Sequence, residues 1–132
     1  MALSNLDYLP VLSNFEYVAP KTIKEACSLL AQYKDKAKLI AGGTDLLVSM
    51  KKRQISPQYL VSIKNIPGLD YIQYSQENGL KIGALATLHS IASHPIVKDK
   101  FGLLGTACNK IGIPQVRNMG TIGGNVCNAG PS

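Results

Sequence analysis

Several residue types are scarce or missing in this 132-residue chain. It has no tryptophan, only 6% aromatic residues and two histidines. No apolar run approaches the roughly 20 residues that cross a bilayer. The three cysteines, Cys27, Cys108 and Cys127, are far apart and form no C-x-x-C pair. These absences argue against a membrane-spanning protein, a disulfide framework and a metal site. They favour a reducing cytoplasm as the location.

The basic charge of the chain is scattered along its length. The formal net charge is +6, and the cations fall in short groups at 34–38, 51–53 and 98–100, two of which contain an aspartate. Stacking aromatic residues do not alternate with these groups, as they do in single-strand binders. We therefore expect a solvated surface and no nucleic-acid partner. The charge also suits an anionic cofactor or an acidic partner subunit.

The composition, 45% hydrophobic and 17% charged, is that of one globular domain. The pattern of apolar residues predicts an α+β fold with two lobes: a small β-α-β unit over residues 1 to about 56, and an antiparallel sheet with helices against it from about 57 to 132. The expected strands are 15–20, 37–42, 59–63 and a hairpin of 70–75 with 80–85. The expected helices are 23–33, a short one near 46–53, 88–93 and 102–112.

Local signals mark where these elements begin and end. Thr22 and Glu25 have the spacing of a capping box, and Thr87 is placed to cap the helix after it. The His94-Pro95 pair is expected to interrupt that helix. For residues 115–132 the sequence predicts a glycine-rich loop and one strand.

Two glycine motifs follow expected elements: AGGTDLL at 41–47 and MGTIGGN at 119–125. Glycine lets a backbone approach a ligand closely, and successive N–H groups in such turns can bind an anion. Either motif alone is more simply a tight turn with an N-cap. Together they predict a diphosphate cradle in which the N–H groups of Gly43 and Gly123 point into one cleft. Neither fits the Rossmann or P-loop pattern.

The motifs AGGTDLL at 41–47, IGALATL at 82–88 and RNMGTIGGNVCNAGPS at 117–132 resemble, in order and spacing, the FAD-binding subunit of the molybdenum hydroxylases. The likeness runs from residue 15 onward. It implies a two-lobed FAD-binding domain of the PCMH (vanillyl-alcohol oxidase-like) type. The implied FAD contacts are Leu39, Ile40, Ala41, Gly42, Gly43, Thr44, Asp45, Leu46, Ile111, Thr121, Ile122, Gly123, Gly124 and Asn125.

The same resemblance implies an oxidoreductase subunit that passes electrons from iron–sulfur clusters through FAD to NAD or another acceptor. Its implied partners are a molybdopterin-binding large subunit and an iron–sulfur small subunit. No catalytic side-chain set and no metal site stand out. The family subunit is about twice as long as this chain. We therefore expect an N-terminal fragment with an incomplete second lobe, which needs its C-terminal remainder and is inactive and weak in FAD binding by itself.

Two alternatives stay open. The second motif also resembles the glycine-rich loop of UDP-N-acetylenolpyruvoylglucosamine reductase, another FAD enzyme. That family carries Gly-Ser-Asn where this chain has Gly-Thr-Asp, and the Arg117-Asn118 pair favours the hydroxylase family. The other alternative is a binding or assembly module without redox activity. Arg117 itself is a candidate either to balance phosphate charge or to pair with a partner subunit.

Overall fold

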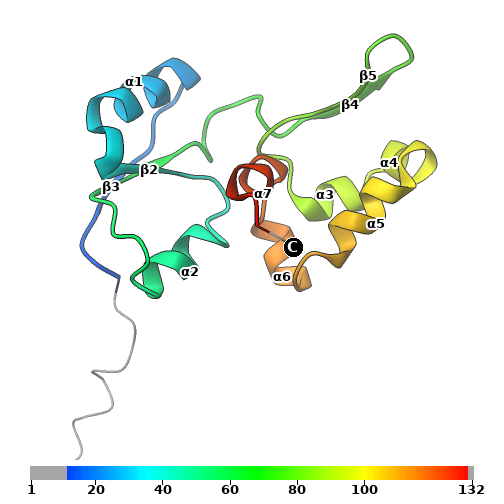
Figure 1. The fold of residues 1–132 in the computed structure, drawn as a ribbon. Coiled ribbons are helices and arrows are strands. Elements are labelled where there is room, and N and C mark those ends of the chain that lie inside the picture. Colours follow the sequence, from blue (N-terminus) through cyan, green and yellow to red (C-terminus); the bar gives the residue numbers. More distant parts are fainter. Residues whose placement is uncertain (1–11, 131–132) are drawn as a thin grey trace, which may run out of the picture.

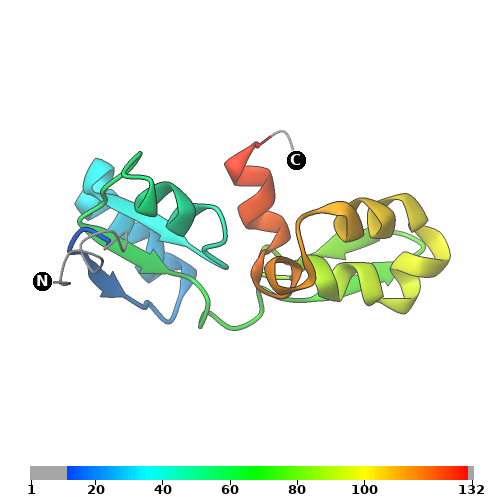
Figure 2. The same cartoon turned by 90° about the horizontal axis from the view of Figure 1, so that it is seen from below.

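The chain folds into two lobes, with the last helix, α7 (Ile122–Asn128), standing between them (Figure 1, Figure 2). A computed structural model describes residues 12–130. The first lobe comprises residues 12–69 and the second residues 70–130. Within the described part, the chain passes from one lobe to the other only near residue 70.

The first lobe contains, in chain order, β1 (Glu16–Val18), α1 (Ile23–Tyr33), the 3-10 helix η1 (Lys34–Lys36), β2 (Ala37–Ile40), α2 (Leu46–Lys51) and β3 (Tyr59–Ser62). Its sheet is parallel, with the order β1-β3-β2. Leu60 of the central strand lies opposite both Tyr17 of β1 and Lys38 of β2. Parallel strands need crossover connections, which α1 and α2 provide.

Helix α1 begins where the sequence predicts. Thr22 Oγ1 accepts a hydrogen bond from Glu25 N–H at 3.1 Å, and the Glu25 carboxylate accepts one from Lys21 N–H at 2.9 Å. The first bond satisfies a backbone donor of the first helical turn, and the second ties the residue before the N-cap to that turn. The helix packs on the sheet through a cluster of buried Ala26, Ala37, Val61 and Ile66, joined by Leu29, Leu30, Tyr33, Tyr59, Ile63 and Leu69.

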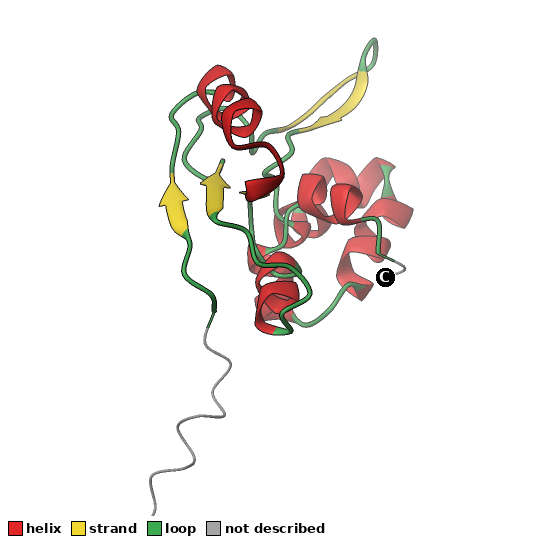
Figure 3. Cartoon of the chain, turned by 60° about the vertical axis from the view of Figure 1, so that its left-hand side comes forward, coloured by secondary structure: helices red, strands yellow, loops and turns green. Residues whose placement is uncertain are grey.

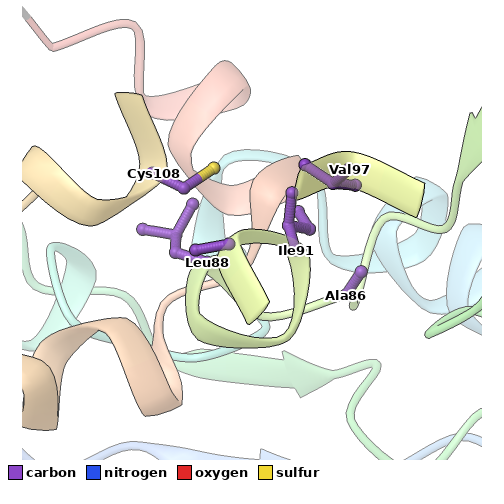
Figure 4. Packing of buried hydrophobic residues seen from close by; sticks show 6 residues of the cluster. Ala86, Leu88, Ile91, Val97 and Cys108 are labelled. Atoms are coloured by element: carbon purple, nitrogen blue, oxygen red, sulfur yellow. The ribbon is translucent and has the colours of Figure 1, made fainter. Parts of the chain in front are cut away.

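The second lobe contains β4 (Ile72–Ser75), β5 (Gly79–Ile82), α3 (Leu88–Ser93), α4 (Pro95–Lys100), α5 (Gly102–Lys110), α6 (Pro114–Met119) and α7. Strands β4 and β5 form the predicted antiparallel hairpin, which projects beyond the helices (Figure 3). The core of the lobe lies among α3, α4 and α5 (Figure 4). Its buried residues are Ala86, Leu88, Ile91, Ala92, Val97 and Cys108.

Three helices of the second lobe differ from the prediction. The loop and strand predicted for 115–132 are wrong over the described residues 115–130, because α6 and α7 occupy most of them; residues 131–132 lie outside the described part. The hydroxyl of Thr121 caps α7 by accepting from Gly124 N–H at 3.1 Å, which helps offset the roughly 1 kcal/mol that each glycine costs in a helix. Pro95 does not only interrupt: it begins α4, since proline is favoured at the first position of a helix.

The boundary between the lobes also differs from the expected one near residue 56. Strand β3, at Tyr59–Ser62, pairs with both β1 and β2 and completes the first sheet. Ile66 and Leu69 pack in the cluster of the same lobe. The boundary therefore lies near residue 70, because long-range parallel pairing holds the intervening residues to the first lobe.

Candidate functional site

A cavity of about 800 Å³, here called the interlobe cavity, is lined by residues of both lobes. Its volume is in the range of small-molecule sites, about 300–1,000 Å³. The first loop (residues 41–45, between β2 and α2) and the second loop (residues 120–125, at the start of α7) both line it, as the sequence predicts. The predicted residues in its walls are Leu39, Ile40, Ala41, Gly42, Gly43, Thr44, Asp45, Leu46, Ile111, Thr121, Gly123, Gly124 and Asn125.

Ile122 is the predicted site residue that the cavity walls leave out. Its side chain packs against the buried cluster of the second lobe, and its N–H donates to Ala86 O at 3.0 Å. The first residue of α7 therefore anchors the second loop. Ile111, by contrast, both lines the cavity and packs against that cluster.

The first loop supplies free backbone donors. Gly43 has φ +73°, which turns the chain after β2, and its carbonyl accepts from Leu47 N–H at 3.0 Å. Among the described residues, no backbone carbonyl accepts from the N–H groups of Gly42 to Leu46. Several successive N–H groups without a backbone partner are the kind of donor set that binds an anion.

The second loop is different, because the N–H groups of both its later glycines and of Asn125 are already used, and only the Thr121 N–H has no acceptor among the described residues. The N–H of Gly123 donates to Ala84 O at 3.0 Å, that of Gly124 to Thr121 Oγ1 at 3.1 Å, and that of Asn125 to Thr121 O at 3.0 Å. The prediction that Gly123 points its N–H into the cleft is therefore wrong. The second loop contributes a wall that includes Thr121 and Asn125, and the first loop contributes the run of successive free amides.

Arg117 has a structural partner. Its Nη1 donates to Ile111 O at 3.2 Å and to Gly112 O at 2.8 Å. Gly112 has φ +54°, so the chain turns sharply there between α5 and α6. Arg117 thus holds the turn that carries Ile111 into the cavity wall. The guanidinium therefore has a structural role within the second lobe.

The charged residues of the cavity lie in the first lobe. Lys38 of β2 and Asp45 before α2 are both exposed and both line the cavity. The Asp45 side chain makes no capping hydrogen bond to α2, so its carboxylate is not tied to the helix.

In the second lobe, burial raises the pKa of the Cys108 thiol above its ordinary value of 9.0. That thiol is a neutral core group.

Other site types find no support in residues 12–130. This part of the chain has no group of three or more histidine, cysteine or acidic residues that could hold a metal ion. None of its helices is long and apolar enough to cross a membrane. Cys27 and Cys127 are exposed, whereas Cys108 is buried.

Several cavity residues escape the sequence prediction. These residues lie outside the two glycine motifs. They come together only in the folded chain. Lys38 is the one with an available signal, since it directly precedes the first predicted stretch. The others include Ser49, Gln54, Ile55, Ile63, Ala84, Leu88, Val116, Cys127 and Asn128.

Residues 13–132 match the family model described as the FAD binding domain in molybdopterin dehydrogenase. The chain is 44% identical over 116 residues to the nicotinate dehydrogenase FAD-subunit of Eubacterium barkeri, an alignment that covers 87% of this chain and 39% of that protein. It is 44% identical over 117 residues to the carbon monoxide dehydrogenase medium chain of Hydrogenophaga pseudoflava, covering 89% and 40%.

Solved structures give the same result. The fold is similar to carbon monoxide dehydrogenase from Hydrogenophaga pseudoflava, with a TM-score of 0.84 and 43% identity over 88% of this chain and 40% of that one. It is also similar to quinoline 2-oxidoreductase from Pseudomonas putida 86, with a TM-score of 0.82 and 31% identity over 88% and 40%. The chain thus spans about 40% of the length of these relatives. It belongs to the family of FAD-binding domains of molybdopterin dehydrogenases.

Proposed function

We propose that this chain holds the diphosphate end of FAD in the interlobe cavity. The observation that carries the proposal is the run of N–H groups from Gly42 to Leu46, which have no backbone acceptor among the described residues and belong to residues that line the cavity. A diphosphate is an anion that such donors recognise. When bound, FAD would supply the one- and two-electron chemistry that the side chains of this chain lack.

The chain's own residues have distinct tasks in this proposal. The first loop donates hydrogen bonds to the phosphates, and Lys38 adds positive charge at the cavity wall. Asn125 offers a side-chain amide from the second lobe, and Ile111 forms part of the apolar wall. Because the N–H groups of Gly123, Gly124 and Asn125 are already used, we assign the second loop mainly to shaping the cavity.

We further propose a setting for the domain. It would form part of a PCMH-type, two-lobed FAD domain in the medium subunit of a molybdenum-containing hydroxylase or dehydrogenase. The proposed partners are a molybdopterin-binding large subunit and an iron–sulfur small subunit, and the proposed electron acceptor is NAD or another molecule. The support is that the relatives are FAD-subunits and medium chains of dehydrogenases. A cytoplasmic location agrees with the unpaired cysteines.

Amide NMR of the ¹⁵N-labelled chain during titration with FAD tests the proposal, because it detects weak as well as tight binding. We expect the amide signals of 42–46 and Asn125 to shift with FAD. Riboflavin, which lacks phosphates, should leave 42–46 unshifted. The hairpin β4–β5 is the internal control. If millimolar FAD shifts no signal, or shifts only signals of the hairpin, the proposal is wrong and a module that does not bind flavin is favoured.

A further inference from the structure

Gly42 lies where the first loop meets the backbone of the second lobe. A Cβ built on Gly42 would overlap the carbonyl oxygen of Met119 and lie 2.7 Å from its carbonyl carbon and 3.2 Å from Gly120 Cα. Carbon atoms pack best at about 3.5–4.0 Å. No side chain can therefore occupy position 42 while the two lobes keep their present spacing.

Backbone conformation does not explain this glycine. The glycines with positive φ are Gly43, Gly68, Gly79 and Gly112, and Gly42 is not among them. An alanine at position 42 would therefore not meet the strain that a side chain meets at positive φ. The requirement for glycine at this position comes from the contact with the other lobe.

The surface that Gly42 touches is firmly held within the second lobe. Met119 is the last residue of α6. Gly120 N–H donates to Val116 O at 2.6 Å, and Gly120 O accepts from Leu88 N–H at 2.9 Å. A displaced Met119 carbonyl would therefore take α6 and α3 with it. The overlap caused by a side chain at position 42 would therefore be relieved more easily by a shift of one lobe than by deformation of this segment.

Among the described residues, helices and strands pack less closely between the two lobes than within each lobe. The chain crosses near residue 70, where Leu85 N–H donates to Leu69 O at 2.7 Å. The contact between Gly42 and Met119 is a second connection, made by segments far apart in the sequence.

We propose that Gly42 is a positioning residue: by allowing the first loop to lie against the Met119–Gly120 backbone, it sets the orientation of the two lobes and the width of the interlobe cavity. Its consequence for FAD rests on the proposed function. The orientation itself does not, so it can be measured without cofactor.

Residual dipolar couplings of the 132-residue chain without FAD test this role. In the wild-type chain, couplings of both lobes should fit one alignment frame with the orientation seen here. In Gly42→Ala, the couplings of each lobe should still fit the structure of that lobe. The couplings of both lobes together should no longer fit the wild-type orientation. Gly102→Ala is the matched control, because a Cβ at Gly102 meets nothing within 4 Å. Wild-type orientation in Gly42→Ala would overturn the proposal.

A second measurement leaves Gly42 in place, in case its variant does not fold. A Cβ on Gly120 would lie 3.5 Å from Thr44 Oγ1, so Thr44→Cys with Gly120→Cys should form a disulfide on mild oxidation. The exposed Cys27 and Cys127 are replaced by serine beforehand. Thr44→Cys with Gly102→Cys is the unlinked control. Failure of the first pair to link above this control would show that the loops do not meet in solution, which overturns the proposal.

Discussion

The N–H of Gly123 donates to the carbonyl oxygen of Ala84 at 3.0 Å, and this bond ties the start of α7 to the connection between β5 and α3. A Cβ on Gly123 would lie 2.8 Å from that oxygen and 2.9 Å from Ala84 Cβ. The sequence suggests that this glycine leaves room for a ligand. In the structure, it leaves room for Ala84, so its requirement arises inside the second lobe.

Gly123→Ala is therefore expected to lower the free energy of unfolding by about 1–3 kcal/mol, the usual cost of overpacking. Gly102→Ala is the control, since a Cβ at Gly102 would meet nothing within 4 Å. Urea unfolding of the two variants and the wild type measures the difference. Gly123→Val should lose more stability still, and would not be a clean probe of cofactor binding. Equal stability of Gly123→Ala and wild type would contradict the packing seen here.

Local signals predicted the elements whose causes are local. Thr22 and Glu25 are three residues apart, and the helix they predict is present, with Thr22 accepting from Glu25 N–H and Glu25 accepting from Lys21 N–H. The position of β3 in the centre of the sheet is not predictable from local signals. It depends on pairing with β1 and β2, which lie far before it along the chain. Helix α7 was missed for another reason: Gly123 and Gly124 disfavour a helix by propensity, and contacts with residues 84–86 override that preference.

Arg117→Lys is expected to lower the free energy of unfolding by about 1 kcal/mol, because a lysine is poorly suited to bridge Ile111 O and Gly112 O as the guanidinium does. Amide exchange in residues 111–113 should become faster. Arg53→Lys is the control, since the Arg53 side chain makes no hydrogen bond among the described residues and is exposed. Equal effects of the two substitutions would mean that the Arg117 bonds contribute nothing specific.

The buried thiol of Cys108 gives the chain a stability that depends on pH. Because burial raises its pKa above 9.0, the native state keeps the proton while the unfolded chain loses it near that pH. The unfolded state then binds fewer protons, so this contribution is fully present below about pH 9 and is lost as the pH rises through the native pKa.

Unfolding experiments at about pH 8 and about pH 10 measure this effect. The wild-type chain should lose more free energy of unfolding between them than Cys108→Ala does. Cys27→Ala should follow the wild type, because Cys27 is exposed. A thiol reagent should modify Cys27 and Cys127 in the native protein and reach Cys108 only on unfolding. Parallel pH profiles for wild type and Cys108→Ala would contradict the assignment.

The motifs predicted which two loops line the cavity, but not how each of them contributes. The two glycine pairs, at 42–43 and at 123–124, look equivalent in the sequence. In both, the missing Cβ permits another group to approach the backbone closely. The difference lies in what approaches: Met119 for Gly42, and Ala84 for Gly123. Which backbone amides remain free depends on these tertiary partners, and no local pattern encodes them.

The last prediction concerns Lys38, the cation in the wall of the interlobe cavity. Lys38→Met should weaken FAD binding at low salt by up to about fivefold, the range of an exposed charge pair. The effect should nearly vanish at about 1 M salt, where the screening length is about 3 Å. Lys36→Met is the matched control: it removes the same charge two residues earlier, at an exposed position outside the cavity walls. Titration of the chain with FAD at both salt concentrations gives the dissociation constants. An equal loss in Lys36→Met would show that only net charge matters, and a loss that persists in high salt would show that Lys38 acts through something other than attraction of the diphosphate.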